Sequence, residues 1–274
     1  GHIYVPMVTT RGCPYRCTYC GGPLNNGHRL RRRSAEHVIE EMRRLKAEYG
    51  VTMVSIVDDN FTMHPAHARE VLTMLIESGL GLAWRAPNGI RLDTLDRELV
   101  ELMERSGCKE LYLGVESGSP RVLDDMKRRV TVETYREKVA LLARYSRIRL
   151  LGFFMLGYPT ETEADAKMTV DLACELPLHR AAFFFFTPHP GTEIYDEMRG
   201  RGEIGDDIWD SLFYDKPTLG SRHIPLRRLR AIQRHAYVLF YARPRIVRHL
   251  MSLARGPRQF ARLARKIAGT ALGV

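Results

Sequence analysis

Six short apolar segments alternate with longer amphipathic segments over the first 200 residues, and this alternation constrains the fold more than any other feature. The apolar segments have the length of strands, and the segments between them repeat apolar residues at helical spacing. The predicted strands are 3–10, 52–58, 82–86, 110–116, 149–156 and 181–187, and the predicted helices are 34–48, 65–78, 96–106, 132–145, 161–176 and 192–198. Repeated strand–helix alternation predicts a parallel sheet covered by helices, either an open sheet or a partial barrel.

The ends of several predicted helices carry residues that commonly begin or end a helix. Hydroxyl side chains precede three of them and glycines follow three; these are Ser34, Thr131 and Thr160 at the starts and Gly50, Gly79 and Gly107 at the ends. A hydroxyl oxygen accepts a hydrogen bond from a free backbone N–H in the first turn. Glu161 and Glu163 follow Thr160, where negative charge interacts favourably with the helix dipole. We therefore expect Glu161 to cap its helix.

Positive charge is concentrated toward the end of the sequence. The formal net charge is +10, but thirteen of the 42 Lys and Arg residues lie after residue 220, where no Asp or Glu occurs, so the remainder holds 29 basic and 32 acidic residues. Apolar residues recur at helical spacing in 226–239 and 260–268, with basic residues between them. These basic amphipathic helices either cap the domain with a solvated face or contact an anionic membrane or an acidic partner. Nucleic acid is disfavoured because the aromatic residues fall at apolar positions.

Three of the five cysteines lie within eight residues, in the stretch TTRGCPYRCTYCGG. Cys13, Cys17 and Cys20 form a C-x3-C-x2-C pattern directly after the first predicted strand. A chain of this length with an odd number of cysteines is not typical of a secreted disulfide scaffold, so reduced thiols kept for chemistry are favoured. Barrel folds hold their active sites at the carboxyl ends of strands, and three thiolates there are well placed to bind a metal.

Two kinds of metal centre compete for these cysteines. Structural zinc requires four protein ligands, and Cys108 and Cys174 do not form a second pair near the loop, so a zinc site would need His28. Such a chain would be a zinc-binding adaptor with a basic, partner-binding tail. A 4Fe-4S cluster held by three cysteines leaves one iron open for chemistry. The open iron favours an enzyme.

The cysteine spacing, with Tyr19 before the last cysteine, resembles the signature of the radical S-adenosylmethionine (SAM) enzymes. Four later segments follow in the order that this family shows: VDDNFT, LYLGVESGS, GFFMLGYPTET and FFFFTPHPGTEIY. The resemblance implies an α/β fold, a partial (β/α)6 TIM-like barrel of the radical SAM type, here with a C-terminal basic helical appendage. It implies that SAM chelates the open iron, and that its reductive cleavage yields a 5'-deoxyadenosyl radical that abstracts hydrogen from substrate.

The resemblance also assigns the SAM-binding positions. They are occupied by Tyr19, Asp58, Asp59, Glu116, Ser117 and Gly157. The two aspartates match polar residues that receive the SAM ammonium, Glu116 with Ser117 matches the ribose-binding position, and Gly157 lies in the adenine-binding segment. Structural alternatives remain for some of them: helix capping for one aspartate, and a salt bridge to Arg91 or Arg85 for Glu116.

The amino-acid sequences of these segments are most similar to those of a subgroup that carries a cobalamin-binding domain ahead of the radical core. That subgroup includes methylases of unactivated carbon or phosphorus and an oxidative cyclase of chlorophyll synthesis. The sequence begins without Met, and its first predicted strand starts already at residue 3. We therefore expect a radical SAM core over 1–203, a basic helical extension over 204–274, and a preceding cobalamin domain that is not in this sequence.

The expected function is radical generation from SAM for cobalamin-dependent methylation of an unactivated carbon or phosphorus centre. The alternative is a radical oxidoreductase, cyclase or lyase that does not use cobalamin. Side chains at strand ends or in loops are the candidates for substrate contact, although each is equally suited to packing or capping; they are Arg85, Asn88, Tyr158 and His189.

Composition and resemblance together set the expected partners. A small-molecule or lipid substrate is expected, with flavodoxin or ferredoxin as the reducing donor. No run of about eighteen apolar residues is available to span a bilayer. We expect a cytoplasmic protein, with peripheral membrane contact through the basic tail as an alternative.

Overall fold

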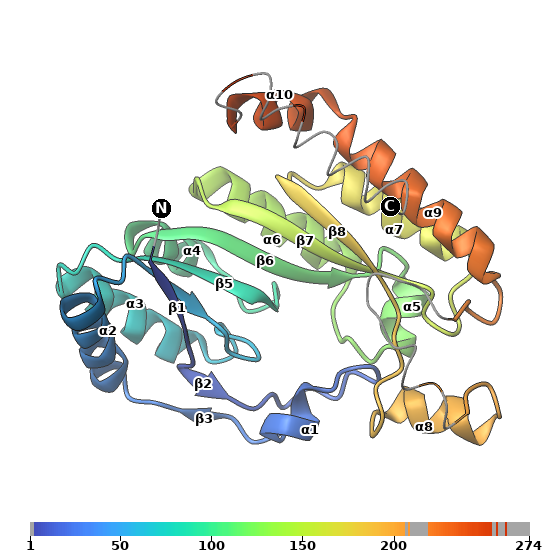
Figure 1. Ribbon diagram of the computed structural model, residues 1–274, viewed down its shortest axis with the longest axis horizontal. Helices are drawn as coiled ribbons and strands as arrows, with labels where there is room; N and C mark the ends of the chain where they lie inside the picture. The colour runs from blue at the N-terminus through green and yellow to red at the C-terminus, as the bar shows by residue number, and fades with distance from the viewer. Residues whose placement is uncertain (1–2, 206–207, 209–218, 254–255, 257–260, 262–274) are drawn as a thin grey trace. The chain divides into compact units, whose positions relative to one another are not determined.

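The computed structural model describes residues 3–205, 208, 219–253, 256 and 261. Its main element is a six-stranded parallel sheet with the strand order β1-β4-β5-β6-β7-β8 (Figure 1). The chain forms two compact units, unit 1 (Gly1–Gly114 and Val130–Leu151) and unit 2 (Val115–Arg129 and Gly152–Val274). The order of the sheet follows the order of the chain, which confirms the predicted α/β fold with a parallel sheet.

Unit 1 holds the strands that lead to the cysteine loop. The strands in its part of the sheet are β1 (Tyr4–Met7), β4 (Met53–Ile56), β5 (Ala83–Ile90) and most of β6 (Cys108–Glu116). A separate antiparallel pair is formed by β2 (Thr10–Arg11) and β3 (Arg31–Arg32). The helices are α1 (Gly22–Asn26), α2 (Ala35–Tyr49), α3 (Pro65–Glu77), α4 (Arg97–Arg105) and α6 (Val132–Tyr145). Every residue of β4 is buried, as expected for a parallel strand covered on both faces.

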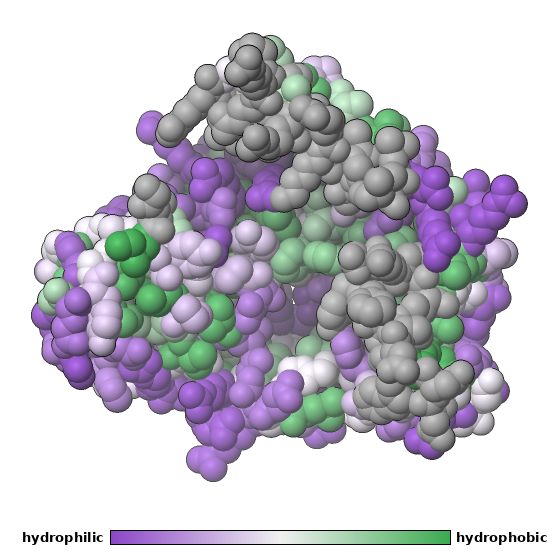
Figure 2. Space-filling model, viewed as in Figure 1, coloured by the Kyte–Doolittle hydropathy of each residue, from purple (hydrophilic) through white to green (hydrophobic). Residues whose placement is uncertain are grey.

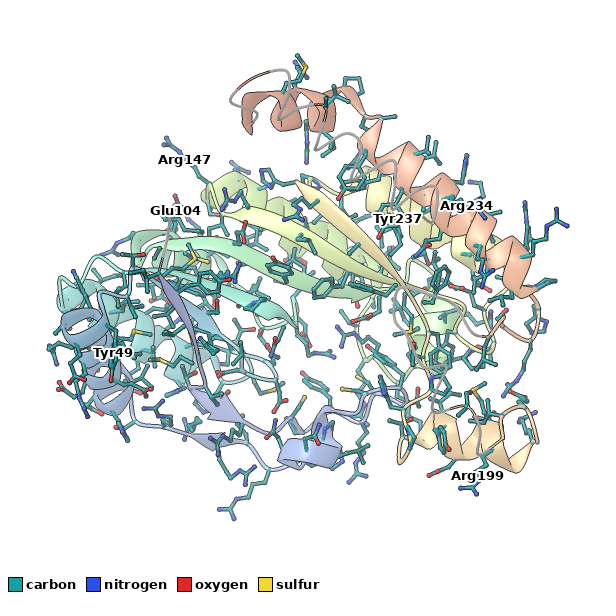
Figure 3. All side chains as sticks on the ribbon, in the orientation of Figure 1. Tyr49, Glu104, Arg147, Arg199, Arg234 and Tyr237 are labelled. Atoms are coloured by element: carbon teal, nitrogen blue, oxygen red, sulfur yellow. The ribbon has the colours of Figure 1, made fainter. Side chains whose placement is uncertain are left out.

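The core of unit 1 packs around Trp84, which is fully buried. Its indole Nε1 donates to the Ser106 hydroxyl at 3.0 Å, and its ring meets Phe61 edge-on at 5.4 Å between centroids. In the last turn of α4, the Glu104 carboxylate accepts a hydrogen bond from the Arg147 N–H at 2.9 Å (Figure 3). These contacts join β5, α4 and the segment after α6 into one framework.

Unit 2 contains the end of β6, most of β7 (Arg149–Leu156), β8 (Arg180–Phe185) and the helices that follow them. The helices are α5 (Pro120–Asp125), α7 (Glu163–Glu175), α8 (Glu193–Gly200), α9 (Leu226–Tyr241) and α10 (Pro244–Leu253). Helix α9 lies along β8 and α7 (Figure 1). Tyr237 fixes it to β8, because its hydroxyl accepts a hydrogen bond from the Phe183 N–H at 3.2 Å (Figure 3).

Most predicted elements are present, and the differences have local causes. The prediction that Thr160 and Glu161 begin a helix is wrong: α7 starts at Glu163, and Thr162 and Asp165 form a reciprocal capping box. The short elements α1, α5, β2 and β3 were not predicted. Each has only two to six residues, and none of them carries the run of apolar residues on which the prediction of the other elements depends.

The basic extension includes α9 and α10. Figure 2 shows hydrophilic side chains over the amino-terminal half of α9, where Arg227, Arg230 and Arg234 are exposed. The predicted amphipathic segment 260–268 lies almost wholly outside the described residues. Because α9 belongs to the same unit as β8, the boundary between 203 and 204 stays a prediction. Within the described part of the chain, no helix combines the length and apolar character needed to cross a membrane.

Candidate active site

The cysteine loop of unit 1 runs from β2 to α1. Cys13, Cys17 and Cys20 are not disulfide-bonded; Cys20 is exposed and the other two are half-buried. The Cys13 N–H donates to the Gly27 carbonyl at 3.2 Å, and the Cys20 N–H donates to the Cys17 carbonyl at 3.1 Å. The half-buried Tyr19 lies in the same loop. Three accessible thiols therefore share one short loop that is closed by its own backbone.

Gly12 allows the close approach of this loop to its neighbours, and Gly22 lies next to two side chains of the site. Gly12 has φ of +93°, and a Cβ there would lie 2.3 Å from the Arg29 carbonyl oxygen, so a side chain is excluded. A Cβ on Gly22 would lie 3.4 Å from the Cys20 Sγ and 3.5 Å from an Asp59 carboxylate oxygen. The last cysteine and Asp59 therefore both border the backbone at Gly22.

Asp58 fastens the ends of the first two strands together. Its carboxylate is buried and accepts four hydrogen bonds: from the N–H of Thr9 at 2.6 Å and of Thr10 at 3.0 Å, and from their hydroxyls at 2.5 Å and 2.9 Å. Burial raises the pKa of Asp58, while these hydrogen bonds act to lower it. The two oxygens are thus engaged in holding the start of the cysteine loop.

Asp59 fixes the loop itself. One of its oxygens accepts the Gly12 N–H at 2.8 Å, and the other accepts the Asn26 side-chain amide at 3.1 Å. Its carboxylate is only half-buried, and each oxygen keeps a lone pair for a further donor. Asp58 and Asp59, which follow β4, therefore organise the cysteine loop by hydrogen bonding, a function that the sequence patterns did not predict.

The thiols fit a 4Fe-4S cluster better than a single metal ion. Among the described residues, no three His, Cys, Asp or Glu side chains come close enough together to hold one ion. His28, the predicted fourth zinc ligand, has its Nδ1 within 3.2 Å of the Cys13 carbonyl oxygen. A cluster distributes three thiolates over separate irons, so its ligands need not converge on one point. Burial raises the pKa of Cys13, and the nearby Arg91 guanidinium opposes this by favouring the thiolate.

In unit 2, Glu116 lies at the end of β6 in an uncommon backbone conformation. Its φ is 68°, and Lys127 and Arg129 both have φ of 52°. Between these two lies Arg128, whose Nη2 is 3.8 Å from the Glu116 Oε1; the side chains are 10% and 17% exposed. A non-glycine residue held in the left-handed region costs on the order of 1–3 kcal/mol, and such strain gathers at functional sites. Glu116 is therefore paired with Arg128, in place of Arg91 or Arg85, which were the expected salt-bridge partners.

Ser117 follows Glu116 but is fully buried. Its hydroxyl lies 3.2 Å from the Thr169 hydroxyl and accepts the Ser119 N–H at 3.1 Å. The Gly118 N–H donates to Thr169 at 3.0 Å, and a Cβ on Gly118 would lie 2.3 Å from the Met168 carbonyl oxygen. Ser117 therefore holds the turn after β6 against α7, and of the pair only Glu116 keeps some exposure.

The turn after β7 is closed by Glu161. Its Oε2 accepts the Gly157 N–H at 2.5 Å, while its Oε1 is buried without a hydrogen-bond partner. Burial raises the pKa of Glu161 to about 8. Gly157 has φ of +85°, and a Cβ there would lie 2.5 Å from Leu229 on α9. Glu161 thus orders the glycine turn, which corrects the expectation that it caps α7.

Arg85 lies near the start of β5, in a row of polar side chains across the strands of unit 1. Its Nε donates to the Ser55 hydroxyl at 2.9 Å, and its Nη1 is 3.8 Å from Glu110. Its guanidinium also lies 5.1 Å from the centre of the Tyr4 ring. These neighbours account for Arg85 structurally, and its contact with substrate stays a prediction.

The other predicted substrate contacts differ in their exposure. Asn88 is exposed, and its amide donates to the Val57 carbonyl at 2.8 Å. Tyr158 is 2% exposed, and its hydroxyl donates to the Asp125 carbonyl at 3.2 Å, so it packs in the core of unit 2. His189 is half-buried, and burial lowers its pKa. Asn88 and His189 are therefore the better placed of these three to meet a ligand.

The family model described as the Radical SAM superfamily matches residues 7–173 of this chain. The chain belongs to this superfamily. As a member of a superfamily that uses a 4Fe-4S cluster and SAM, it is an enzyme whose cofactors are those two groups. This membership overturns the zinc-binding adaptor alternative.

Similar proteins include an uncharacterized methyltransferase of Pyrococcus horikoshii, 30% identical over 241 residues, with 88% of this chain and 52% of that protein covered. The cytidylyl-2-hydroxyethylphosphonate methyltransferase of Streptomyces wedmorensis is 34% identical over 217 residues, with 76% of this chain and 39% of that protein covered. The radical SAM methyltransferase TsrM of Kitasatospora setae, solved with cobalamin and a [4Fe-4S] cluster, shares the fold with a TM-score of 0.67 at 22% identity, covering 73% and 37% of the two chains. This radical SAM chain spans about half or less of the length of these relatives.

Two residues of the site region had no assigned role in the sequence patterns. Arg128 reaches Glu116 only because of the backbone turns on both sides of it, which no spacing rule describes. Arg91 was considered only as a salt-bridge partner. The signal that could have drawn attention to it is the RLD segment directly after β5, where a basic and an acidic residue two positions apart follow a buried strand.

Proposed function

We propose that this chain is the radical-forming part of an enzyme that methylates an unactivated carbon or phosphorus centre with cobalamin as methyl carrier. The observation that carries the proposal is the braced loop with three accessible thiols, in a radical SAM chain that is similar to methyltransferases. The cobalamin in the TsrM structure supports this cofactor. The alternative is a radical oxidoreductase, cyclase or lyase without cobalamin.

The three cysteines would ligate three irons of the cluster. When bound, the cluster supplies an electron that cleaves SAM and starts hydrogen abstraction. The protein's part is to hold the loop in one conformation, and Asp58 and Asp59 do so through six hydrogen bonds to its two ends. A loop fixed in advance does not have to be ordered when the ligand binds.

Asp59 is the better candidate of the two aspartates for the SAM ammonium. All four hydrogen bonds observed at Asp58 come from Thr9 and Thr10, and the residue is buried. Asp59 borders Gly22 together with Cys20, and it accepts only one bond on each oxygen. A carboxylate that keeps a lone pair on each oxygen forms a charge-assisted hydrogen bond with an ammonium group.

In unit 2 we assign ribose binding to Glu116 and adenine binding to the turn at Gly157. Ser117 supports the first role by fixing the turn that follows Glu116. Glu161 supports the second by fixing the Gly157 N–H. Asn88 and His189 are the side chains we assign to the substrate. A small-molecule or lipid substrate and a one-electron donor such as flavodoxin or ferredoxin complete the proposed partners.

The test uses the anaerobically reconstituted chain with SAM, reductant and added cobalamin, and chromatography of the products. Formation of both 5'-deoxyadenosine and S-adenosylhomocysteine, with the second dependent on cobalamin, is expected for methylation. 5'-Deoxyadenosine without S-adenosylhomocysteine would instead favour the oxidoreductase, cyclase or lyase. Neither product from a chain with a complete cluster would contradict the proposal.

A further inference from the structure

A buried arginine lies beside the cysteine loop. Arg91 follows the last residue of β5 and is 5% exposed. Its backbone is held by Asn60 and Thr62: the Arg91 N–H donates to the Asn60 Oδ1 at 3.4 Å, and the Thr62 hydroxyl lies 3.4 Å from the Arg91 carbonyl oxygen. The backbone of Arg91 is therefore fixed in place, and the charge of its guanidinium is largely removed from water.

Arg91 forms a two-point ion pair with Asp93. Its Nε donates to one carboxylate oxygen at 3.1 Å and its Nη2 donates to the other at 2.9 Å. The Asp93 side chain is 25% exposed, compared with 6% for the side chain of Arg91. Solvent therefore screens the negative partner more than the positive one.

The same guanidinium contacts the cysteine loop through Tyr15, which lies between Cys13 and Cys17. Its carbon Cζ is 3.7 Å from the centre of the Tyr15 ring, a distance typical of a cation–π contact. The Tyr15 hydroxyl donates to Asp93 at 3.2 Å, which closes the contact among the three side chains. We define Tyr15, Arg91 and Asp93 as the arginine clamp.

The charge in the clamp lies beside the cysteine loop, because the Arg91 guanidinium contacts Tyr15, which stands between Cys13 and Cys17 in the sequence. A cluster held by three thiolates gains one negative charge when a one-electron donor reduces it. A fixed positive charge in a site of low dielectric favours the more negative of the two states.

We propose that Arg91 is a positioning residue that raises the reduction potential of the cluster held by Cys13, Cys17 and Cys20, and that Asp93 limits this effect by partly neutralising it. The contact with Tyr15 holds the Arg91 charge next to the loop. The inference rests on the 4Fe-4S cluster of the proposed function. It adds a means of making the cluster easier to reduce before SAM is cleaved.

The test is a potentiometric titration of the reconstituted chain with dithionite, in which the EPR signal of the reduced cluster is measured. Arg91→Gln is expected to lower the equilibrium constant for one-electron reduction about tenfold, which corresponds to a potential about 59 mV more negative. Asp93→Asn is expected to shift the potential in the positive direction. Arg91→Lys keeps the positive charge and is expected to shift the potential less than Arg91→Gln does. The matched control is Arg97→Gln, an exposed arginine on α4, which is expected to leave the potential unchanged.

Opposite shifts in Arg91→Gln and Asp93→Asn support the proposal, because a loosened loop would shift both variants in the same direction. Shifts of the same sign, or no shift in either variant, would overturn it. Iron and sulfide analysis of each variant shows that the cluster is complete. If Arg91→Gln does not take up a full cluster, Asp93→Asn is still informative because Asn has the shape of Asp: a positive shift of its potential supports the proposal, and a negative shift or none overturns it. Failure of the wild-type chain to assemble any cluster would instead reject the proposed function.

Discussion

Two turns after strands of the sheet each bury a carboxylate, and they satisfy it in different ways. After β4, Asp58 accepts four hydrogen bonds from Thr9 and Thr10. After β7, Glu161 accepts one bond from Gly157, and its second oxygen is buried without a partner. A buried carboxylate is stable as an anion only when donors replace the lost water. The first turn is therefore a fixed anchor, whereas the second depends on a proton.

Removing the anchor has the largest expected effect. Asp58→Ala leaves the buried N–H groups and hydroxyls of Thr9 and Thr10 without their acceptor. The two hydroxyls can rotate, but the two N–H groups cannot, and each buried group left unsatisfied costs roughly 1–3 kcal/mol, so we expect a loss of about 2–6 kcal/mol in the free energy of unfolding. Urea unfolding followed by circular dichroism measures it. A loss below about 1 kcal/mol would mean that the four bonds do not hold the loop.

Protonation of Glu161 has the second-largest expected effect, and it changes how the free energy of unfolding depends on pH. Its folded-state pKa of about 8 lies above the ordinary value of 4.5, so the folded chain keeps a proton that the unfolded chain releases. The stability that this proton provides is complete below about pH 4.5 and is lost as the pH rises to about 8. We expect wild type to lose up to about 1.4 kcal/mol per pH unit in this range relative to Glu161→Gln.

The matched control for that comparison is Glu163→Gln. Glu163 begins α7 two residues later, is exposed, and pairs with Arg228. Urea unfolding at a series of pH values should give Glu163→Gln the same slope as wild type. Equal slopes in wild type and Glu161→Gln would show that Glu161 is ionised in the folded chain at neutral pH.

The glycine that Glu161 holds is expected to tolerate no side chain. Gly157→Ala combines a left-handed backbone with a Cβ 2.5 Å from Leu229, and we expect about 2 kcal/mol of destabilisation. Gly202→Ala is the control, since Gly202 has φ of +70° and nothing lies within 4 Å of its Cβ position. The difference between their thermal unfolding midpoints isolates the clash. Equal losses would mean that Leu229 moves aside freely.

The smallest effect tests a single bond of the anchor. Thr9→Val replaces the hydroxyl that donates to Asp58 by a methyl group of similar size, while the Thr9 N–H still donates. We expect a loss of about 1 kcal/mol, the usual contribution of one hydrogen bond. Chemical denaturation of Thr9→Val in the wild-type and Asp58→Ala backgrounds checks this. The loss should disappear when Asp58 is already absent, and an additive loss would show that the hydroxyl acts elsewhere.

The same contrast explains which features could be predicted from the sequence. The strand β7 and the helix α6 each carry a clear hydrophobic period, and both have their predicted bounds. The cysteines were found because metal chemistry needs three thiols at short spacing. The partners of Asp58 could not be found, because Thr9 and Thr10 lie 48 or 49 residues away and meet it only when β1 pairs with β4.

In unit 2, the prediction from sequence failed for different reasons. Glu161 follows Thr160 and precedes a helix, so its sequence context is that of a capping residue. Its carboxylate instead turns back to Gly157, because Thr162 and Asp165 already cap α7. The pairing of Glu116 with Arg128 depends on three left-handed residues that are not glycine, and propensity rules disfavour that conformation.

The central claim is that Cys13, Cys17 and Cys20 hold the cluster that cleaves SAM. The most direct test is the yield of 5'-deoxyadenosine from the reconstituted chain with SAM and dithionite, compared between Cys17→Ala and Cys174→Ala. Cys174 is a half-buried thiol on α7 and has no assigned role. We predict wild-type yield from Cys174→Ala and none from Cys17→Ala. Equal yields from the two variants, or zinc in place of iron in the wild-type chain, would contradict the account.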